Sequence, residues 1–175
     1  MKIYGIVVAL FVALLTASVS AQEIKPTVEV RLEYLMTLEV QMDLPQLVGA
    51  RRVVNVSGGT LRGPNINGTL VAPSGDWLYN MPDGSSRLDV RLMVKTDDNE
   101  LIFMEYAGIM AFPKEAGERL NKGEAVTHAD GYFLVVPRFT TASTKYAWLN
   151  HVQAVGKMVS LQRGHAIKYD IFEMK

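Results

Sequence analysis

The residue types best suited to chemistry in this chain are one carboxylate and two guanidinium groups that fall in alternating stretches of sequence. Asp89 and Arg91 share one face of residues 88–96, because side chains two residues apart on a strand point the same way. Arg138 ends a second such stretch, residues 132–138. A carboxylate can act as a general base, and a guanidinium group stabilises the negative charge that proton removal creates. We therefore predict Asp89, Arg91 and Arg138 as catalytic residues.

Aromatic residues and one amide near these positions suit the walls of a ligand pocket. In residues 146–150 two aromatic side chains and an amide share one parity, and another aromatic residue shares a face with Arg138. Small-molecule sites usually combine apolar walls with a few placed polar groups. If the polar strand faces turn inward, these side chains converge with Asp89 and Arg91 inside the fold. The predicted ligand-binding residues are Trp77, Tyr132, Tyr146, Trp148 and Asn150.

A purely structural interpretation of the same residues stays open. Asp89 and Arg91 also suit an ion pair on a solvated strand face. Arg138 follows a proline and suits a loop anchor. Residues 146–150 equally suit core aromatics with a hydrogen-bonded amide. The two interpretations differ in whether these groups face a lumen or water.

Composition excludes several other kinds of site. The 175 residues include no Cys, and 18 Lys+Arg balance 18 Asp+Glu. Disulfides and thiolate metal sites are therefore excluded, and a neutral chain gives no electrostatic reason to bind nucleic acid. His128, His151 and His165 lie far apart, and no phosphate-binding or dinucleotide-binding loop occurs. We predict no metal, no cofactor and no nucleic-acid partner.

The N-terminus has the organisation of a secretory signal. Lys2 is the first charge, an apolar run covers residues 6–15, and Val19 and Ala21 occupy the small-residue positions of a cleavage site. We predict that residues 1–21 are a signal peptide, that residues 22–175 form one domain, and that the protein is secreted or periplasmic. An uncleaved membrane anchor is the alternative; after cleavage no membrane contact is expected. In a eukaryotic host, Asn55 and Asn67 would be glycosylation acceptors.

Alternation of apolar and polar residues with a period of two covers most of the mature chain. It is longest in residues 28–42, where Leu35 breaks the pattern, and residues 113–121 alone suit a short helix. Further strands are predicted at residues 52–56, 60–62, 66–71, 77–80, 87–96, 101–111, 131–139, 146–150, 152–162 and 165–174. This pattern favours an all-β fold, a single-domain antiparallel β-barrel with one short helix.

An ordered series of motifs resembles a known family. The motifs are Ser57-Gly58-Gly59-Thr60-Leu61-Arg62-Gly63-Pro64, Asp76-Trp77, Pro82-Asp83-Gly84, Arg87-Leu88-Asp89-Val90-Arg91, Thr96-Asp97-Asp98, Pro137-Arg138-Phe139 and Tyr146-Ala147-Trp148-Leu149-Asn150. Together they are similar to uncharacterised protein family 0311, also called domain of unknown function 3237, over residues 28–173. The resemblance implies a small antiparallel β-barrel with a central pocket and supplies no reaction. The signal peptide departs from the family pattern, as does Asn99-Glu100 in a turn.

Two main hypotheses about function follow. The first is a cofactor-free isomerase, lyase or cyclase that acts on a small hydrophobic oxygenated metabolite. The second is a non-catalytic, lipocalin-like barrel that binds such a molecule. A purely structural secreted protein is a third alternative. The expected partner is a small-molecule ligand, and homo-oligomer formation stays open.

The signal-peptide hypothesis predicts that the mature chain begins at Gln22. The small residues before it are those that signal peptidase accepts. N-terminal sequencing of exported protein should return Gln22 first. A chain that still begins at Met1 would contradict both cleavage and the secretory hypothesis.

Overall fold

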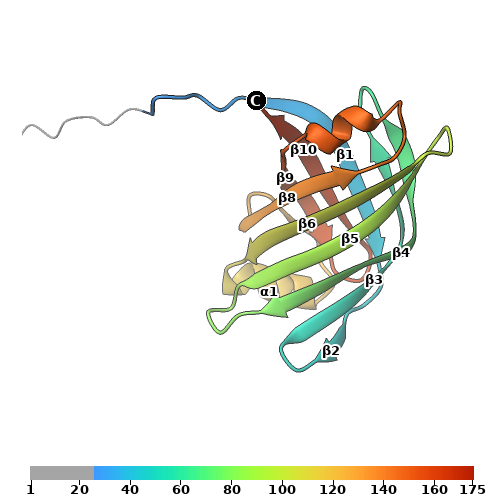
Figure 1. The fold of residues 1–175 in the computed structure, drawn as a ribbon. Helices are drawn as coiled ribbons and strands as arrows, with labels where there is room; N and C mark the ends of the chain where they lie inside the picture. Colours follow the sequence, from blue (N-terminus) through green and yellow to red (C-terminus); the bar gives the residue numbers. More distant parts are fainter. Residues whose placement is uncertain (1–25) are drawn as a thin grey trace, which may run out of the picture.

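The computed structural model describes residues 26–175, so the predicted signal peptide lies outside the described residues. The elements are β1 (Leu32–Met42), β2 (Gln46–Val48), β3 (Arg51–Arg62), β4 (Asn67–Asn80), β5 (Ser86–Thr96), β6 (Leu101–Ala111), α1 (Lys114–Asn121), β7 (Val126–Thr127), β8 (Tyr132–Thr140), the 3₁₀ helix η1 (Ala147–His151), β9 (Ala154–Gln162) and β10 (Ala166–Met174). All strand pairs are antiparallel (Figure 1). The all-β prediction is confirmed.

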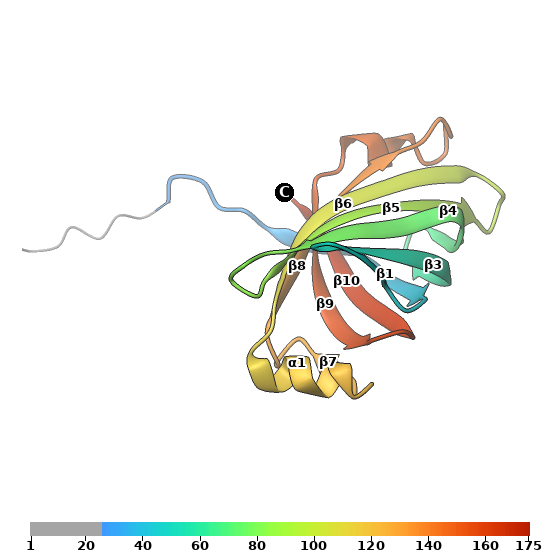
Figure 2. The same ribbon diagram turned by 90° about the horizontal axis from the view of Figure 1, so that it is seen from below.

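Eight of the strands close into a barrel. Neighbours follow the order β1-β10-β9-β8-β6-β5-β4-β3, and β3 pairs back onto β1. Seen from below, the strands fan out side by side, with α1 and β7 beyond β9 (Figure 2). The short strand β2 extends β3, and β7 pairs with β9. Closure leaves the long strands with partners on both sides, which removes exposed sheet edges.

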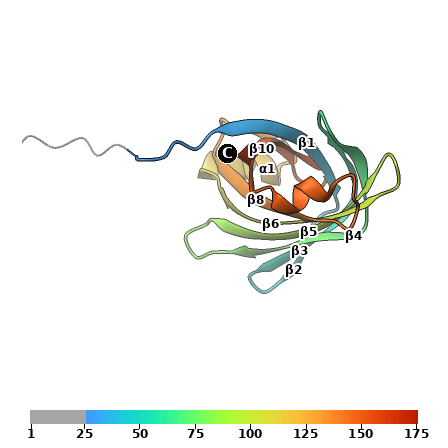
Figure 3. The same ribbon diagram turned by 45° about the horizontal axis from the view of Figure 1, so that its top comes forward.

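The half of the barrel next to η1 is packed solid. Its inward side chains are 0–1% exposed and include Met36, Leu38, Leu61, Leu92, Val94, Ile102, Met104, Met158 and Ile171. Burial of each such side chain stabilises the fold by about 1.5–3 kcal/mol relative to exposure. Leu149 of η1 is 0% exposed and belongs to the same cluster. The η1 segment therefore closes this end of the barrel (Figure 3).

The η1 segment corrects one predicted strand. Residues 146–150 form a turn and the 3₁₀ helix instead. Asp98, in the β5–β6 turn, accepts hydrogen bonds from the Tyr146 hydroxyl at 3.0 Å and from Thr96 Oγ1 at 2.6 Å. Alternation over five residues is too short to distinguish a strand from a segment that folds back over a barrel end.

Bends and bulges in long strands explain the other differences. The predicted segments 52–56 and 60–62 form one strand, β3, and segments 66–71 and 77–80 form β4. Pairing between β3 and β4 shifts register at residues 55–60, where Gly58 and Gly59 pair with β1 instead. Leu35, which breaks the alternation, lies at a register shift between β1 and β10, so both Leu35 and Met36 are buried.

The predicted helix is confirmed. It spans Lys114–Asn121, so it begins one residue later than predicted, with Pro113 as its N-cap. Its buried side chains, Ala116 and Leu120, pack against the core. In residues 26–175, no helix has the length and apolar character needed to cross a bilayer.

Gly59 sits at the close approach of β3 and β1. Its φ is +147°, and a Cβ there would lie 2.2 Å from the Glu39 carbonyl oxygen. We predict that Gly59→Ala lowers the free energy of unfolding by at least about 1–3 kcal/mol, because backbone strain of this kind costs that much. Urea denaturation measures the change.

Gly117→Ala is the matched control for this prediction. Gly117 lies within α1, and nothing lies within 4 Å of a Cβ built there. Alanine in a helix interior should stabilise the protein by about 0.5–1 kcal/mol. Equal effects of the two substitutions would show that Gly59 has no special backbone role.

Candidate functional site

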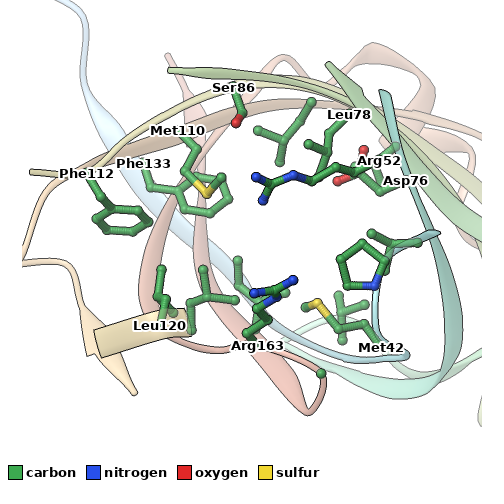
Figure 4. A pocket seen from close by; sticks show the side chains of 18 of the residues that line it. Met42, Arg52, Asp76, Leu78, Ser86, Met110, Phe112, Leu120, Phe133 and Arg163 are labelled. Atoms are coloured by element: carbon green, nitrogen blue, oxygen red, sulfur yellow. The ribbon is translucent and has the colours of Figure 1, made fainter. Parts of the chain in front are cut away.

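A cavity of about 250 Å³ occupies the half of the barrel away from η1 (Figure 4). Its walls are mostly apolar and include Val54, Leu88, Val90 and Phe133 from the three strands β3, β5 and β8. The rim is formed by the segment after β1, by the end of α1 and by the β9–β10 turn. A concave, largely apolar space that opens to solvent at one end and holds a few polar groups is typical of a small-molecule site.

Asp76 supplies a carboxyl group to this cavity from β4. It belongs to the inward row of β4 with Leu78 and Asn80, all three of which line the cavity. Its Oδ1 accepts a hydrogen bond from the backbone N–H of Asp89 at 3.2 Å. Among residues 26–175 it has no ion-pair partner.

The surroundings of Asp76 favour its protonated form. The pKa of Asp76 is raised to about 7, mainly by burial; the hydrogen bond from the Asp89 N–H opposes the increase, and the negative charge of Asp89 adds to it. A carboxyl group with a pKa near neutrality exists in both protonation states under ordinary conditions. It can therefore accept or donate a proton.

Two tyrosines lie deep in the same cavity. Tyr106 and Tyr169 are 5% and 1% exposed, and their rings meet edge to face at 5.9 Å. Burial raises the pKa of both hydroxyl groups above the ordinary value, and the charge of Asp76 raises it further. Both hydroxyl groups thus stay protonated. Because Tyr169 donates its proton to Tyr106, the Tyr106 hydroxyl is the one whose proton is free for another acceptor.

Two guanidinium groups reach into the cavity nearer its rim. Arg52 comes from β3, and Arg163 from the β9–β10 turn (Figure 4). Arg163 Nη1 donates a hydrogen bond to Asn121 Oδ1 at 2.8 Å. Burial lowers the pKa of Arg52, and the positive charge of Arg163 lowers it further. The two cations therefore act on each other across the cavity.

The cavity thus combines one acid–base group, two neutral hydroxyl donors and two cations inside apolar walls. This arrangement can hold an oxygenated molecule and exchange a proton with it. In the part of the chain that the structure describes, no group of three or more His, Asp or Glu side chains is placed to hold a metal ion.

The predicted catalytic residues lie on the outer surface of the barrel. Asp89 and Arg91 form an ion pair at 2.8 Å with side chains 51% and 47% exposed. Arg138 pairs with Glu105 at 3.2 Å and is 68% exposed. The prediction that these groups converge in the interior is wrong. The apolar face of β5 turns inward, because burial of its aliphatic side chains outweighs any gain from lining the lumen with charge.

The predicted ligand-binding residues are also outside the cavity. Trp77 lies on the outer surface, with the Arg91 guanidinium 5.7 Å from its ring centre, and Tyr132 is 51% exposed. Asn150 is exposed and exchanges hydrogen bonds with the backbone of Thr141. Asn150 therefore stabilises the loop that contains Thr141, and Trp77 and Tyr132 lie on the solvent side of their strands.

The two remaining aromatic predictions belong to the closed end of the barrel. Tyr146 is 4% exposed, and its hydroxyl donates to Asp98; Trp148 is partly buried against the core. The two predicted sequon asparagines, Asn55 and Asn67, are exposed.

Strand parity could have identified two of the residues that sequence reasoning missed. Arg52 shares parity with Val54 and Val56 on β3, and Asp76 shares parity with Leu78 on β4. A charged residue in line with a buried aliphatic row is a signal of an inward polar group. No such signal marks Arg163, because turn residues have no alternating pattern.

Sequence comparisons identify a protein family and a relative of this chain. Residues 30–174 match the family described as "Protein of unknown function (DUF3237)". A UPF0311 protein of Clostridium acetobutylicum is 31% identical over 131 residues, which cover 71% of this chain and 83% of the relative.

Two solved structures resemble the barrel. A conserved protein of unknown function from Rhodopseudomonas palustris has a TM-score of 0.77 at 25% identity, covering 85% of this chain and all of the other. A "beta-barrel like protein" from Acinetobacter baumannii has a TM-score of 0.66 at 28% identity, covering 88% of this chain and all of the other.

The raised pKa of Asp76 predicts a specific pH dependence of stability. Between the unfolded value of 3.8 and the folded value of about 7, the native state binds the proton more tightly, so stability is lost as pH rises through this range. Asp76→Asn should therefore be more stable than the unsubstituted protein at about pH 8, by up to about 4 kcal/mol, and the gain should shrink toward about pH 4. Urea denaturation at both pH values measures it.

Asp83→Asn provides a control of opposite sign. Hydrogen bonds from the Ser85 side chain and then its backbone N–H lower the pKa of Asp83. This substitution should lower stability at neutral pH and have less effect as pH falls. A gain for Asp76→Asn that does not change with pH would contradict the role assigned to burial.

Proposed function

The chain belongs to the DUF3237 family of proteins of unknown function, and we propose that its barrel is a cofactor-free acid–base catalyst. Its substrate is a small, mostly apolar, oxygenated molecule held in the cavity, and Asp76 moves the proton. The single observation that carries this proposal is an inward carboxyl group, without an ion-pair partner in residues 26–175, in a half-open cavity with mostly apolar walls. Carboxyl groups in such surroundings are typical of general acids and bases.

The proposed reaction is proton transfer next to a carbonyl group. The Asp76 carboxylate removes a proton from carbon, and the electron pair of the C–H bond moves into an enolate. The hydroxyl group of Tyr106, which accepts a hydrogen bond from Tyr169, donates one to the enolate oxygen, as preorganised donors do in other enzymes. Return of the proton to another carbon completes an isomerisation, and expulsion of a leaving group completes an elimination.

The cavity surroundings support this chemistry in a second way. Apolar walls exclude water, so a carboxylate in the cavity is less solvated and more basic than one on the surface. Asp89, on the neighbouring strand, is half-exposed and paired with Arg91. The two carboxyl groups therefore differ in environment although their residues are linked by a hydrogen bond.

A non-catalytic binding barrel is the second candidate. The observation that favours it is the shape of the site, a cavity open at one end of an antiparallel barrel of the kind that holds one small ligand. In that case the protein carries its ligand, and Asp76 contributes only affinity. Secretion or a periplasmic location remains part of either proposal.

The test is base-catalysed ring opening of 5-nitrobenzisoxazole, a small neutral aromatic molecule. A base removes the C3 proton, the N–O bond breaks, and a coloured cyanophenolate forms without any cofactor. We expect catalysis whose rate rises with pH through about 7 as Asp76 ionises. Asp76→Asn should lower the rate by at least about 100-fold, the usual contribution of a general base.

Two further variants sharpen the result. Glu105→Gln changes an outer-surface carboxylate and should leave the rate unchanged. Asp89→Asn tests the original sequence prediction; loss of activity there, with activity kept in Asp76→Asn, would overturn the assignment of Asp76. Absence of any Asp76-dependent reaction would overturn catalysis and favour the binding barrel.

A further inference from the structure

We propose that Arg52 and Arg163 form a binding site for an anionic oxygen group, so that the ligand of the cavity is a small molecule with an apolar body and a carboxylate-like head. This inference deepens the proposed function and rests on it only in that the ligand occupies the same cavity. Both guanidinium groups extend into the opening shown in Figure 4. They approach it from separate parts of the chain, β3 and the β9–β10 turn.

The first argument is charge. Neither Arg52 nor Arg163 forms an ion pair within residues 26–175. Asp76 lines the same cavity but lies within ion-pair distance of neither. Arginine stays protonated in proteins, so two partly buried cations share one half-open cavity and repel each other. An anion placed between them removes that repulsion.

The second argument is unsatisfied hydrogen bonding. The Nε atoms of Arg52 and Arg163 are both buried and lack a hydrogen-bond partner. Buried donors normally have an acceptor, and exceptions call for an explanation. Guanidinium groups present a planar fork of donors that matches the two oxygens of a carboxylate. A bound carboxylate would supply acceptors to both arginines at once.

The third argument is that the site is held in place. Arg163 Nη1 donates to the side chain of Asn121, the last residue of α1, at 2.8 Å. Gln162 Nε2 donates to the carbonyl of Gly123 at 3.0 Å. The turn that carries Arg163 is therefore tied to the end of α1. A fixed cation loses less entropy when it binds an anion than a free surface side chain does.

The walls define the rest of the ligand. Leu88, Val90 and Phe133 line the same cavity and offer only apolar contact. An apolar body lying against them, with its anionic head between the arginines, can present a carbon atom to Asp76. Arg52 and Asp76 lie on adjacent strands, where Val54 pairs with Asp76.

The experiment compares two probes that differ in charge. Isothermal titration calorimetry measures the binding of 2-naphthoate and of the neutral 2-naphthalenemethanol to the protein and its variants. The unsubstituted protein should prefer 2-naphthoate. Arg52→Gln and Arg163→Gln should each weaken 2-naphthoate binding by about 10- to 100-fold, as expected for hydrogen bonds to a charged group, and leave 2-naphthalenemethanol binding unchanged.

Arg51→Gln is the matched control. Arg51 precedes Arg52 on β3 but faces outward, where its Nη1 donates to the Trp77 carbonyl at 3.0 Å. This variant should bind both probes as the unsubstituted protein does. Arg52→Lys and Arg163→Lys keep the charge and serve as substitutes if a glutamine variant fails to fold, as judged by circular dichroism. Each lysine variant should still lose affinity, because lysine cannot form the planar pair of hydrogen bonds.

Equal affinity for the two probes, no binding of either, or unchanged 2-naphthoate affinity in both inward variants would overturn the anion site. The ring-opening assay is read out by its dependence on Asp76, whereas the calorimetry is read out by its dependence on Arg52 and Arg163, so the two proposals can fail separately. Charge selectivity without Asp76-dependent catalysis would overturn the acid–base proposal and leave the anion site standing. Asp76-dependent catalysis without charge selectivity would overturn the anion site and leave the acid–base proposal in place.

Discussion

Closure of the barrel is the constraint on which the rest of the structure depends. Because β1 pairs with both β10 and β3, the sheet has a single inward face to which each strand contributes alternate residues. An eight-stranded interior is just wide enough to be filled by side chains or to hold one small ligand. This barrel does both. Large aliphatic residues fill the half under η1, and the other half retains a cavity.

The cavity differs from the packed half in the charges it contains. Asp76, Arg52 and Arg163 line the cavity, whereas aliphatic side chains fill the packed half. Partly buried charge without an ion-pair partner is costly, and the packed half shows that this fold accepts an apolar filling. Groups with shifted pKa values inside a pocket cluster at functional sites. The cost of these three side chains is therefore best explained by a ligand.

On the outer surface of the barrel, charged and aromatic residues alternate along the strands, a pattern that in the sequence alone looks like a binding site. Arg91 and Arg138 both pair in register with Glu105, and Trp77 lies against Arg91. Exposed ion pairs of this kind contribute little stability each, and the aromatic ring covers the backbone of a glycine, Gly75, beside it. Aromatic residues interleaved with charges thus mark the solvated face, while the catalytic candidate lies on the other side of the same strands.

The sequence by itself determined the fold class, the family, the helix α1 and most strand spans, with Leu101–Ala111 matching residue for residue. These features depend on local periodicity and turn residues, which are written in consecutive positions. It also contained a usable signal for Arg52 and Asp76, since each aligns with buried aliphatic neighbours. Only the tertiary structure decided that residues 146–150 fold over the barrel end, and that Arg163 meets Arg52 and Asp76 in one cavity. Alternation says which residues share a face, but strand pairing between distant segments decides which face is enclosed and which side chains meet there.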